Sequence, residues 1–119
     1  MAAWGACYDV AWSAIARSWH VEITESIDGV PIRLTAERWL HVVENHDEVA
    51  GYYDEVLETV ASPDIIVPGY KGSLIAVRSY GRQRHLCVVY RKVSRTDGFI
   101  ITAYFSRTID RRKAIWKRA

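Results

Sequence analysis

The sequence predicts an α+β fold in which N-terminal helices pack on one face of a four-stranded antiparallel β-sheet. Two observations lead to this fold class. Apolar residues recur at helical spacing in the first half of the chain, whereas alternating, β-branched segments separated by turn residues fill the second half. Because these strand-like segments follow one another at hairpin distance, we expect a consecutive meander. The 119 residues, half of them hydrophobic, are enough for a single domain with its own core.

Residues 1–31 are predicted to form an extension, made of a helix and a hairpin, to a core over 32–119. Apolar residues at three- and four-residue intervals indicate an amphipathic helix over 7–19. Residues 21–25 alternate as a strand does, Asp28-Gly29 is a hairpin-turn signal, and 30–34 would be the returning strand. Pro31 predicts that the returning strand lies at a sheet edge, because proline cannot donate a ladder hydrogen bond.

Two helices are expected next. Thr35 suits the N-cap of a helix over 36–45, whose apolar stripe runs from Trp39 to His46. Asp47 can cap a second helix from 48 to about 61, which Ser62-Pro63 would end. The remaining chain reads as strands over 65–67, 73–80, 84–92 and 98–106, followed by a tail with a basic helical turn or two around residues 115 and 116.

Charge is divided sharply along the chain. Residues 1–64 carry twelve acidic and three basic side chains, a net charge of −9, whereas 65–119 carry two acidic and thirteen basic ones, a net charge of +11. Tyrosine and tryptophan accompany these cations. Such a segment is typical of a surface that binds a polyanion such as nucleic acid. Composition alone leaves open whether that surface cuts nucleic acid, holds it or pairs with the acidic half.

Several classes of protein are not expected. Cys7 and Cys87 are far apart, and the histidines lack metal-ligand spacing, so neither a structural zinc site nor another cofactor is predicted. Two isolated cysteines fit a reducing cytoplasm. The N-terminus lacks the pattern of a signal peptide, and no run of 18 apolar residues predicts a membrane span.

Strand alternation predicts which side chains share a face of the sheet. In the last strand, one apolar set should meet the helices: Phe99, Ile101, Ala103 and Phe105. The other, open face would then carry Arg78, Tyr80, Thr102, Tyr104 and one of Arg91 and Lys92. Arginines can fork onto phosphate oxygens, and tyrosines offer rings for stacking and hydroxyls for proton transfer. A solvated sheet face is the plainer alternative.

Histidines are the candidates for acid–base chemistry near neutral pH. His46 ends its helix on the core-facing stripe beside Asp47-Glu48, where it would act in a site or fix the corner between the helices. His85 and Arg84, at a strand start, are further substrate-binding candidates. His41 is expected to be a solvated helix residue.

Several segments together resemble one family. The helix RLTAERWLHVVENHDEV, then VLETVASPDIIV, HLCVVYRK, DGFIITAYFSR and a closing Ile-Trp are similar to the prophage- and toxin-associated nucleases of the barnase–EndoU–colicin–RelE superfamily. In those chains a helix ends in a His-Pro-Glu-like triplet, here His46-Asp47-Glu48, and a Thr-Ala-Tyr follows near the end, here residues 102–104. The resemblance spans about residues 32–116.

The resemblance implies a metal-independent endoribonuclease that uses the ribose 2′-hydroxyl as nucleophile, in a toxin or prophage-linked effector. His46, Thr102 and Tyr104 match family positions: His46 would be the general base or acid, Thr102 would position the reacting group, and Tyr104 would stack a base or donate a proton. Arg78 and Arg91 enter as phosphate ligands from the strand-face argument alone, with Tyr80, Arg84, His85 and Lys92 as substrate-binding residues.

The expected partners are RNA, of the tRNA or mRNA class, and an acidic antitoxin or immunity protein, because a free ribonuclease would harm its host. Two other functions remain open from the sequence. One is a non-catalytic RNA-binding module. The other is an interaction protein in which the acidic half of one copy docks on the basic half of another.

Overall fold

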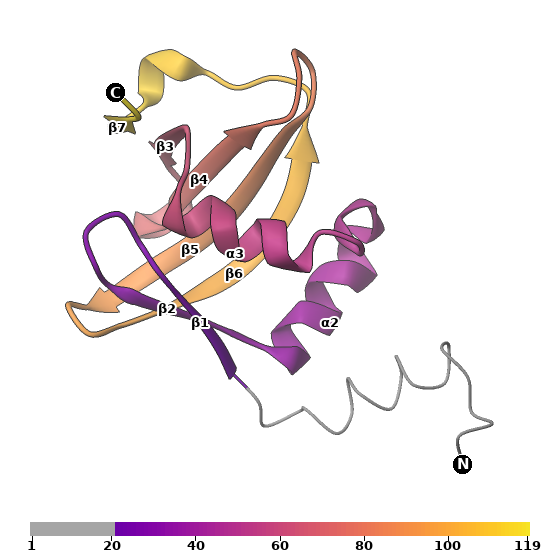
Figure 1. The fold of residues 1–119 in the computed structure, drawn as a ribbon, viewed down its shortest axis with the longest axis vertical. Coiled ribbons are helices and arrows are strands. Elements are labelled where there is room, and N and C mark those ends of the chain that lie inside the picture. Colours follow the sequence, from indigo (N-terminus) through magenta and orange to yellow (C-terminus); the bar gives the residue numbers. More distant parts are fainter. Residues whose placement is uncertain (1–20) are drawn as a thin grey trace.

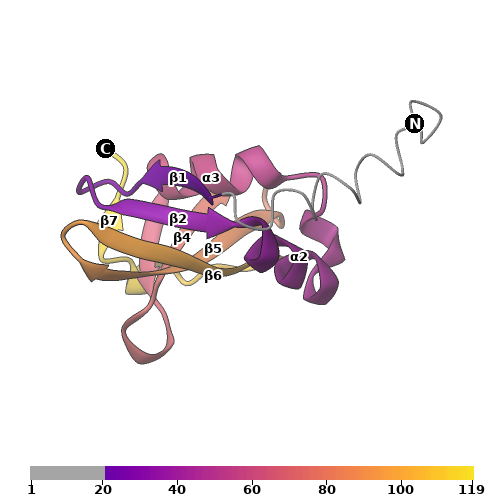
Figure 2. The same cartoon turned by 90° about the horizontal axis from the view of Figure 1, so that it is seen from below.

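A computed structural model describes residues 21–119, which form one seven-stranded mixed sheet and two α-helices (Figures 1 and 2). Helix α3 (Tyr53–Ala61) covers one face of the sheet, and helix α2 (Ala36–Asn45) lies beside the sheet. The strand order is β1-β2-β6-β5-β4-β3-β7. The prediction of a four-stranded antiparallel sheet is therefore wrong. The N-terminal hairpin joins the sheet through a parallel contact, and the C-terminal segment adds another strand at the opposite edge. The helix expected over 7–19 lies outside the described residues.

The predicted hairpin is confirmed. Strands β1 (Val21–Glu25) and β2 (Pro31–Thr35) pair antiparallel, and Gly29 takes the positive φ of 82° in the turn between them. The edge position expected for β2 is wrong, because β2 lies between β1 and β6. Proline is tolerated here because Pro31 is the first residue of the strand, while the parallel pairing with β6 involves only Arg33, opposite Phe99.

The helix predicted over 36–45 is confirmed, and the one predicted over 48–61 is shorter than expected. Helix α2 (Ala36–Asn45) begins where Thr35 Oγ1 accepts the Arg38 backbone N–H at 3.0 Å. The single helix predicted over 48–61 is instead the 3-10 helix η2 (Asp47–Val49), a turn, and α3 (Tyr53–Ala61). Asp47 does not cap it, and the break falls at Gly51, whose backbone entropy disfavours a helix interior.

The C-terminal strands follow the expected meander within the larger sheet. They are β3 (Ile65–Pro68), β4 (Leu74–Ser79), β5 (His85–Ser94) and β6 (Asp97–Ser106), each antiparallel to the next. Between β3 and β4 a loop containing η3 (Tyr70–Gly72) projects from the side of the sheet opposite α3 (Figure 2). This loop and α3 therefore lie on opposite sides of the sheet.

The main core lies between the helices and the sheet, and it draws on both halves of the chain. Ile32, Val42 and Val56 from the acidic half are almost fully buried beside Leu86 and Val88 from the basic half. Burial of this kind contributes roughly 1.5–3 kcal/mol for each large aliphatic side chain. The described residues of the acidic half thus share one core with the strands of the basic half.

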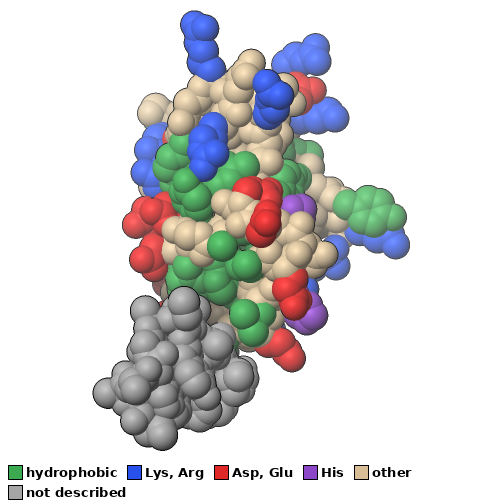
Figure 3. All heavy atoms as spheres, turned by 90° about the vertical axis from the view of Figure 1, so that its right-hand side faces the viewer, with side chains coloured by type: hydrophobic (Ala, Val, Ile, Leu, Met, Phe, Trp, Pro, Cys, Tyr) green, Lys and Arg blue, Asp and Glu red, His purple; other side chains and the backbone are tan. Residues whose placement is uncertain are grey.

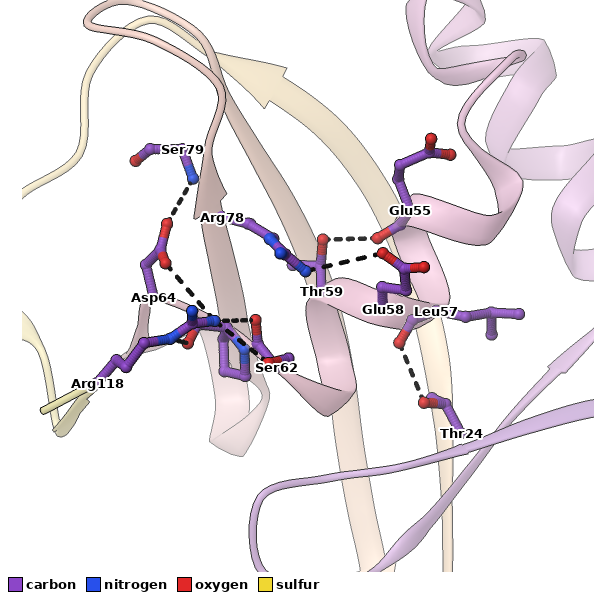
Figure 4. Close-up of polar contacts among 11 residues, drawn as sticks. Thr24, Glu55, Leu57, Glu58, Thr59, Ser62, Asp64, Arg78, Ser79 and Arg118 are labelled. Carbon is purple, nitrogen blue, oxygen red and sulfur yellow. Dashed lines mark hydrogen bonds and ion pairs between the residues drawn. The ribbon is translucent and has the colours of Figure 1, made fainter.

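The C-terminal tail crosses to the far edge of the sheet. It forms the 3-10 helix η4 (Arg111–Lys113) and strand β7 (Trp116–Lys117), which pairs antiparallel with β3. The helical turn expected around residues 115 and 116 is therefore wrong. Figure 4 shows why the strand stays there: Arg118 donates to the backbone carbonyl of Ser62 at 2.6 Å, to that of Pro63 at 3.3 Å, and lies 3.7 Å from Asp64 Oδ1. Among residues 21–119, no helix has the length and apolar character needed to span a membrane.

Candidate active site

The sheet face turned away from α3 is the open face, defined by the register of β4, β5 and β6. Val77, Cys87 and Tyr104 lie side by side across these strands, and Val89 lies opposite Thr102. Val77 and Cys87 belong to a second apolar cluster against which Tyr104 packs. Thr102 and Tyr104 therefore share the open face, as the sequence predicted.

His46 reaches these two residues because η2 docks on the edge of β6. Strand β2 pairs with β6 only at Phe99, so η2 can pack on the rest of that edge. There Glu48 Oε2 accepts the backbone N–H of Phe105 at 3.5 Å. The His46 N–H meanwhile closes α2 on the Val42 carbonyl at 2.8 Å. Together these contacts bring the His46 ring to within 5.7 Å of the Tyr104 ring, centroid to centroid.

A shallow pocket of about 410 Å³ opens beside this pair. Helix α2 with its C-cap and the middle of β6 line it with Arg38, His41, Val42, Asn45, His46, Ile101 and Thr102. The pocket holds two imidazoles, a guanidinium and a hydroxyl. These groups can donate hydrogen bonds to an anion, and an imidazole can also serve as a general acid or base. Each imidazole lies 3.7 Å from a carboxylate, His41 from Glu44 and His46 from Glu48.

Tyr104 remains a proton donor at neutral pH. Burial raises the pKa of its phenol above the ordinary value of 10, and the neighbouring Cys87 side chain raises this pKa further. A protonated phenol next to an imidazole can donate a hydrogen bond or a proton to an oxygen that gains negative charge. The ring is still partly exposed, so a ligand on the open face can reach it.

Arg78 and Tyr80 do not belong to this site, contrary to the strand-face prediction. Arg78 lies opposite Leu86, which in turn lies opposite Phe105, so all three share the face covered by the helices. Arg78 Nη1 lies 3.8 Å from Glu58 Oε2 on α3 (Figure 4). The Tyr80 ring packs 6.4 Å from that of Phe105, and burial raises the pKa of its phenol. The prediction was wrong because it placed all polar strand residues on the open face. Arg78 can lie on the face covered by α3 because the Glu58 carboxylate pairs with its charge there.

The apolar face predicted for β6 is also only partly right. Ala103 and Phe105 meet the helices as expected, but Ile100 is the third core residue, only 1% exposed. A β-bulge explains the difference: Ile100 pairs with Tyr90 and Thr102 pairs with Val89, so Ile101 is an extra residue without its own partner. Alternation therefore changes phase at Ile101, which lines the pocket instead of the core.

The other predicted cations have intramolecular partners. Arg91 lies on the open face, but its Nη2 donates to the carbonyl of Lys71 in the projecting loop. Lys92 forms an ion pair of 2.6 Å with Asp28. Arg84 stacks over the ring of Phe105 at 4.1 Å and donates to the hydroxyl of Tyr52 at 2.7 Å. These three residues therefore stabilise loops and turns, and none lies in the His46 pocket.

His85 lies at the far end of the open face in a second pocket. Its side chain is buried, with Nδ1 2.8 Å from Ser79 Oγ and Nε2 3.1 Å from the carbonyl of Arg82. This pocket has a volume of about 660 Å³, and three of its lining residues are arginines: Arg82, Arg107 and Arg111.

Sequence reasoning missed these three arginines, and it also missed Arg38 and His41. For the α2 residues a signal existed. Arg38, His41 and Asn45 are spaced by three and four positions, so they share one helix face that ends beside His46. The arginines of the second pocket come from a turn and from the tail, which no periodic pattern connects.

Basic side chains gather at one end of the molecule. Three cations of the basic half pair with acids of the acidic half: Arg78 with Glu58, Lys92 with Asp28 and Arg118 with Asp64. Figure 3 shows Lys and Arg side chains gathered at the upper end, and Asp and Glu lower down on the same face. Some cations of the basic half are thus paired with acidic residues of the same chain, and others gather at one end of the molecule.

The described residues contain no group of three or more potential ligands that could hold a metal ion. No protein-family model matches the chain, and comparison with the curated proteins and with the solved structures gave no significant match.

Proposed function

We propose that this protein is a metal-independent endoribonuclease of the toxin or prophage-effector type, related to the superfamily that its sequence resembles. The observation that carries the proposal is the contact between His46 and Tyr104 beside the pocket of Thr102, Arg38 and His41. The motif-matched residues come from a helix end and a strand 56 or more positions away along the chain. Their convergence on one surface is what a shared catalytic role requires.

The proposed reaction transfers a phosphoryl group within the RNA. The ribose 2′-oxygen forms a bond to the adjacent phosphorus as the bond from phosphorus to the 5′-oxygen breaks, which leaves a 2′,3′-cyclic phosphate and a free 5′-hydroxyl. One group must accept the 2′-hydroxyl proton and another must protonate the leaving oxygen. His46 accepts the first proton, Tyr104 supplies the second, and Thr102 orients the ribose or phosphate.

Arg38 and His41 take the role that Arg78 and Arg91 had in the sequence prediction. A cation that meets the extra negative charge of the pentacoordinate phosphate commonly contributes about 3 kcal/mol, or a hundredfold in rate. Arg38 lies in the pocket and has no carboxylate partner among the described residues. The substrate would be RNA of the tRNA or mRNA class in the cytoplasm, with an acidic antitoxin or immunity protein as the inhibitory partner.

A non-catalytic RNA-binding module is the second candidate. The arginine-lined pocket around His85 favours it, because that pocket can hold a phosphate without any proton transfer. The third possibility, pairing between the acidic and basic halves of two copies, has less support, because several of those charges already pair within one chain.

Cleavage of RNA by the pure protein in EDTA distinguishes the first two functions. We expect oligonucleotides with a 2′,3′-cyclic phosphate end, and growth arrest when the protein is expressed. His46→Gln, which keeps some hydrogen bonding, and Tyr104→Phe should each lower the cleavage rate at least about a hundredfold. Their thermal midpoints should stay near that of the wild type. Binding without cleavage by the wild type, or full activity in both variants, would reject the nuclease.

A further inference from the structure

Several contacts hold the backbone around the pocket at the basic end. Two anchors fix the tail that contributes Arg107 and Arg111. Ile109 packs in the second apolar cluster on the open face, and Ser106 Oγ donates to the Thr108 carbonyl at 2.7 Å while accepting the Thr108 N–H at 3.3 Å. The Arg107 guanidinium is held by Gln83 Oε1 at 3.1 Å. The chain is therefore ordered around the pocket before any ligand arrives.

His85 fixes the backbone of the third arginine, Arg82. The His85 Nε2–H donates to the Arg82 carbonyl, so Nδ1 is left to accept a hydrogen bond from the Ser79 hydroxyl. Both ring nitrogens are thus satisfied, which makes His85 the buried floor of the pocket and a brace for the β4–β5 turn. It fixes the backbone of Arg82 and does not itself act on a ligand.

The arginines of this pocket are not paired with acidic side chains of the described residues. Within the described part of the chain, Arg82, Arg107 and Arg111 form no ion pair with a carboxylate. The nearby Asp110 is engaged elsewhere, because its carboxylate accepts the backbone N–H of Arg112 at 3.0 Å and lies 3.2 Å from Arg112 Nε. Three uncompensated guanidinium groups around a cavity of about 660 Å³ attract a phosphate-sized anion, which they can hold in bidentate fashion.

We infer that this pocket is a second phosphate subsite, which binds the backbone of the RNA chain away from the point of cleavage. The identity of the polyanion rests on the proposed function. Strand β6 connects the two sites: Tyr104 and Ser106 share the open face, and Arg107 follows Tyr104 by three residues, roughly 10 Å of extended chain. A single strand lying along β6 would thus contact the arginine pocket and the His46 pair together.

The test measures binding separately from cleavage. The probe is a fluorescein-labelled single-stranded 2′-O-methyl RNA, which lacks the nucleophile, and anisotropy gives its affinity between roughly 50 and 200 mM salt. The variants are Arg82→Ala, Arg107→Ala and Arg111→Ala. The matched control is Arg95→Ala, which removes an exposed arginine from the β5–β6 turn at the other end of the sheet. Thermal midpoints verify that every variant is folded.

Each pocket variant should bind the probe at least about fivefold more weakly, with a log–log salt slope smaller by about 0.7 for each phosphate that the variant no longer neutralises. Arg95→Ala should change neither quantity beyond the effect of removing one distant charge. Pocket variants that bind like Arg95→Ala would overturn the inference. Millimolar inorganic phosphate that displaces the probe completely would also overturn it, by showing a site for the free ion.

The two proposals can fail separately. If wild-type protein cleaves no RNA but the pocket variants bind the probe more weakly, the subsite stands and the nuclease does not. If the wild type cleaves RNA and the pocket variants cleave it with unchanged KM, the nuclease stands and the subsite is rejected.

Discussion

At the residue scale, the partner of each arginine decides whether it can serve a ligand. Arg78 and Arg38 carry the same charge and lie in the same small protein, yet Arg78 faces Glu58 on the helix side while Arg38 lines the pocket beside His46. The sequence alone cannot distinguish them, because both stand on amphipathic elements next to polar neighbours. Their roles depend on the strand register and on the helix that packs over it.

This difference gives a paired prediction. Arg38→Ala should lower RNA cleavage about a hundredfold, because it removes a cation from the developing charge, while the thermal midpoint stays nearly unchanged. Arg78→Ala should leave cleavage unchanged and cost at most about 1 kcal/mol, the usual range of a partly exposed ion pair. Cleavage rates and thermal unfolding of both variants decide the matter. If Arg78→Ala instead lowered cleavage and Arg38→Ala did not, Arg78 would belong to the site, as the strand-face prediction had it.

A second residue-scale prediction concerns alkaline pH. Burial raises the pKa of the Cys87 thiol from 9.0 to about 11, and burial with the nearby Asp28 charge raises that of Tyr90 from 10.0 to about 12. In the unfolded chain both groups have their ordinary, lower pKa values, so they release their protons at a lower pH than in the folded protein. The free energy of unfolding should therefore be unaffected by them below pH 9 and fall as pH rises toward 11.

Chemical denaturation across this pH range measures the effect. Ionisation of Cys87 should lower the free energy of unfolding by about 2–3 kcal/mol once the pH exceeds the thiol's folded-state pKa. Cys87→Ala removes this contribution, so stability should decline less steeply above pH 9, even though the poorer packing lowers stability at every pH. An equal decline in the variant would show that the thiol is not responsible.

At the element scale, local sequence patterns predict single helices and hairpins, but they do not predict the long-range pairings and bulges that join them. The hairpin, α2 and the four-strand meander follow from local patterns, and they are confirmed. The parallel contact between β2 and β6 involves residues 66 positions apart, Arg33 and Phe99, and no local pattern specifies it. Likewise, the bulge at Ile101 depends on how β5 and β6 fit together, so the phase change it causes was not predictable.

The substitution Gly98→Ala tests how closely β6 packs against β2 and β5. A Cβ built on Gly98 would lie 2.7 Å from the Arg91 carbonyl oxygen and 2.5 Å from Cδ1 of Ile32, so the backbone of β5 would have to move. Gly98→Ala should destabilise the protein by about 1–3 kcal/mol. Gly51→Ala is the control, because a Cβ there meets nothing within 4 Å. Urea denaturation of both variants measures the difference, and equal stabilities would refute the close approach.

At the scale of the whole molecule, the described parts of the two oppositely charged halves share one core. The core between helices and sheet includes residues from both halves, and ion pairs such as Lys92–Asp28 join them at the surface. The candidate site follows the same logic, since His46 comes from the acidic half and Tyr104 from the basic half. The sequence identified both residues through their motifs, but only the three-dimensional contact joins them to Arg38 and His41.

Limited proteolysis tests this unity. We expect no stable fragment that begins near Ser62, because removal of the hairpin, α2 and α3 would expose the whole apolar face of the sheet to water. Mass spectrometry of a digestion time course is the measurement. A resistant fragment of residues 62–119 would show that the strands fold without the acidic half.

The strand order has a mechanical consequence. The first and last strands, β1 and β7, occupy opposite edges of the sheet. A force applied between residue 21 and the C-terminus would therefore run across the strands, and it would open the backbone ladder one bond at a time. Strand β7, with only two paired residues, would detach first, together with the Arg118 contacts. Because β6 lies in the interior of the sheet, the surface that bears Thr102 and Tyr104 would remain intact through this first step.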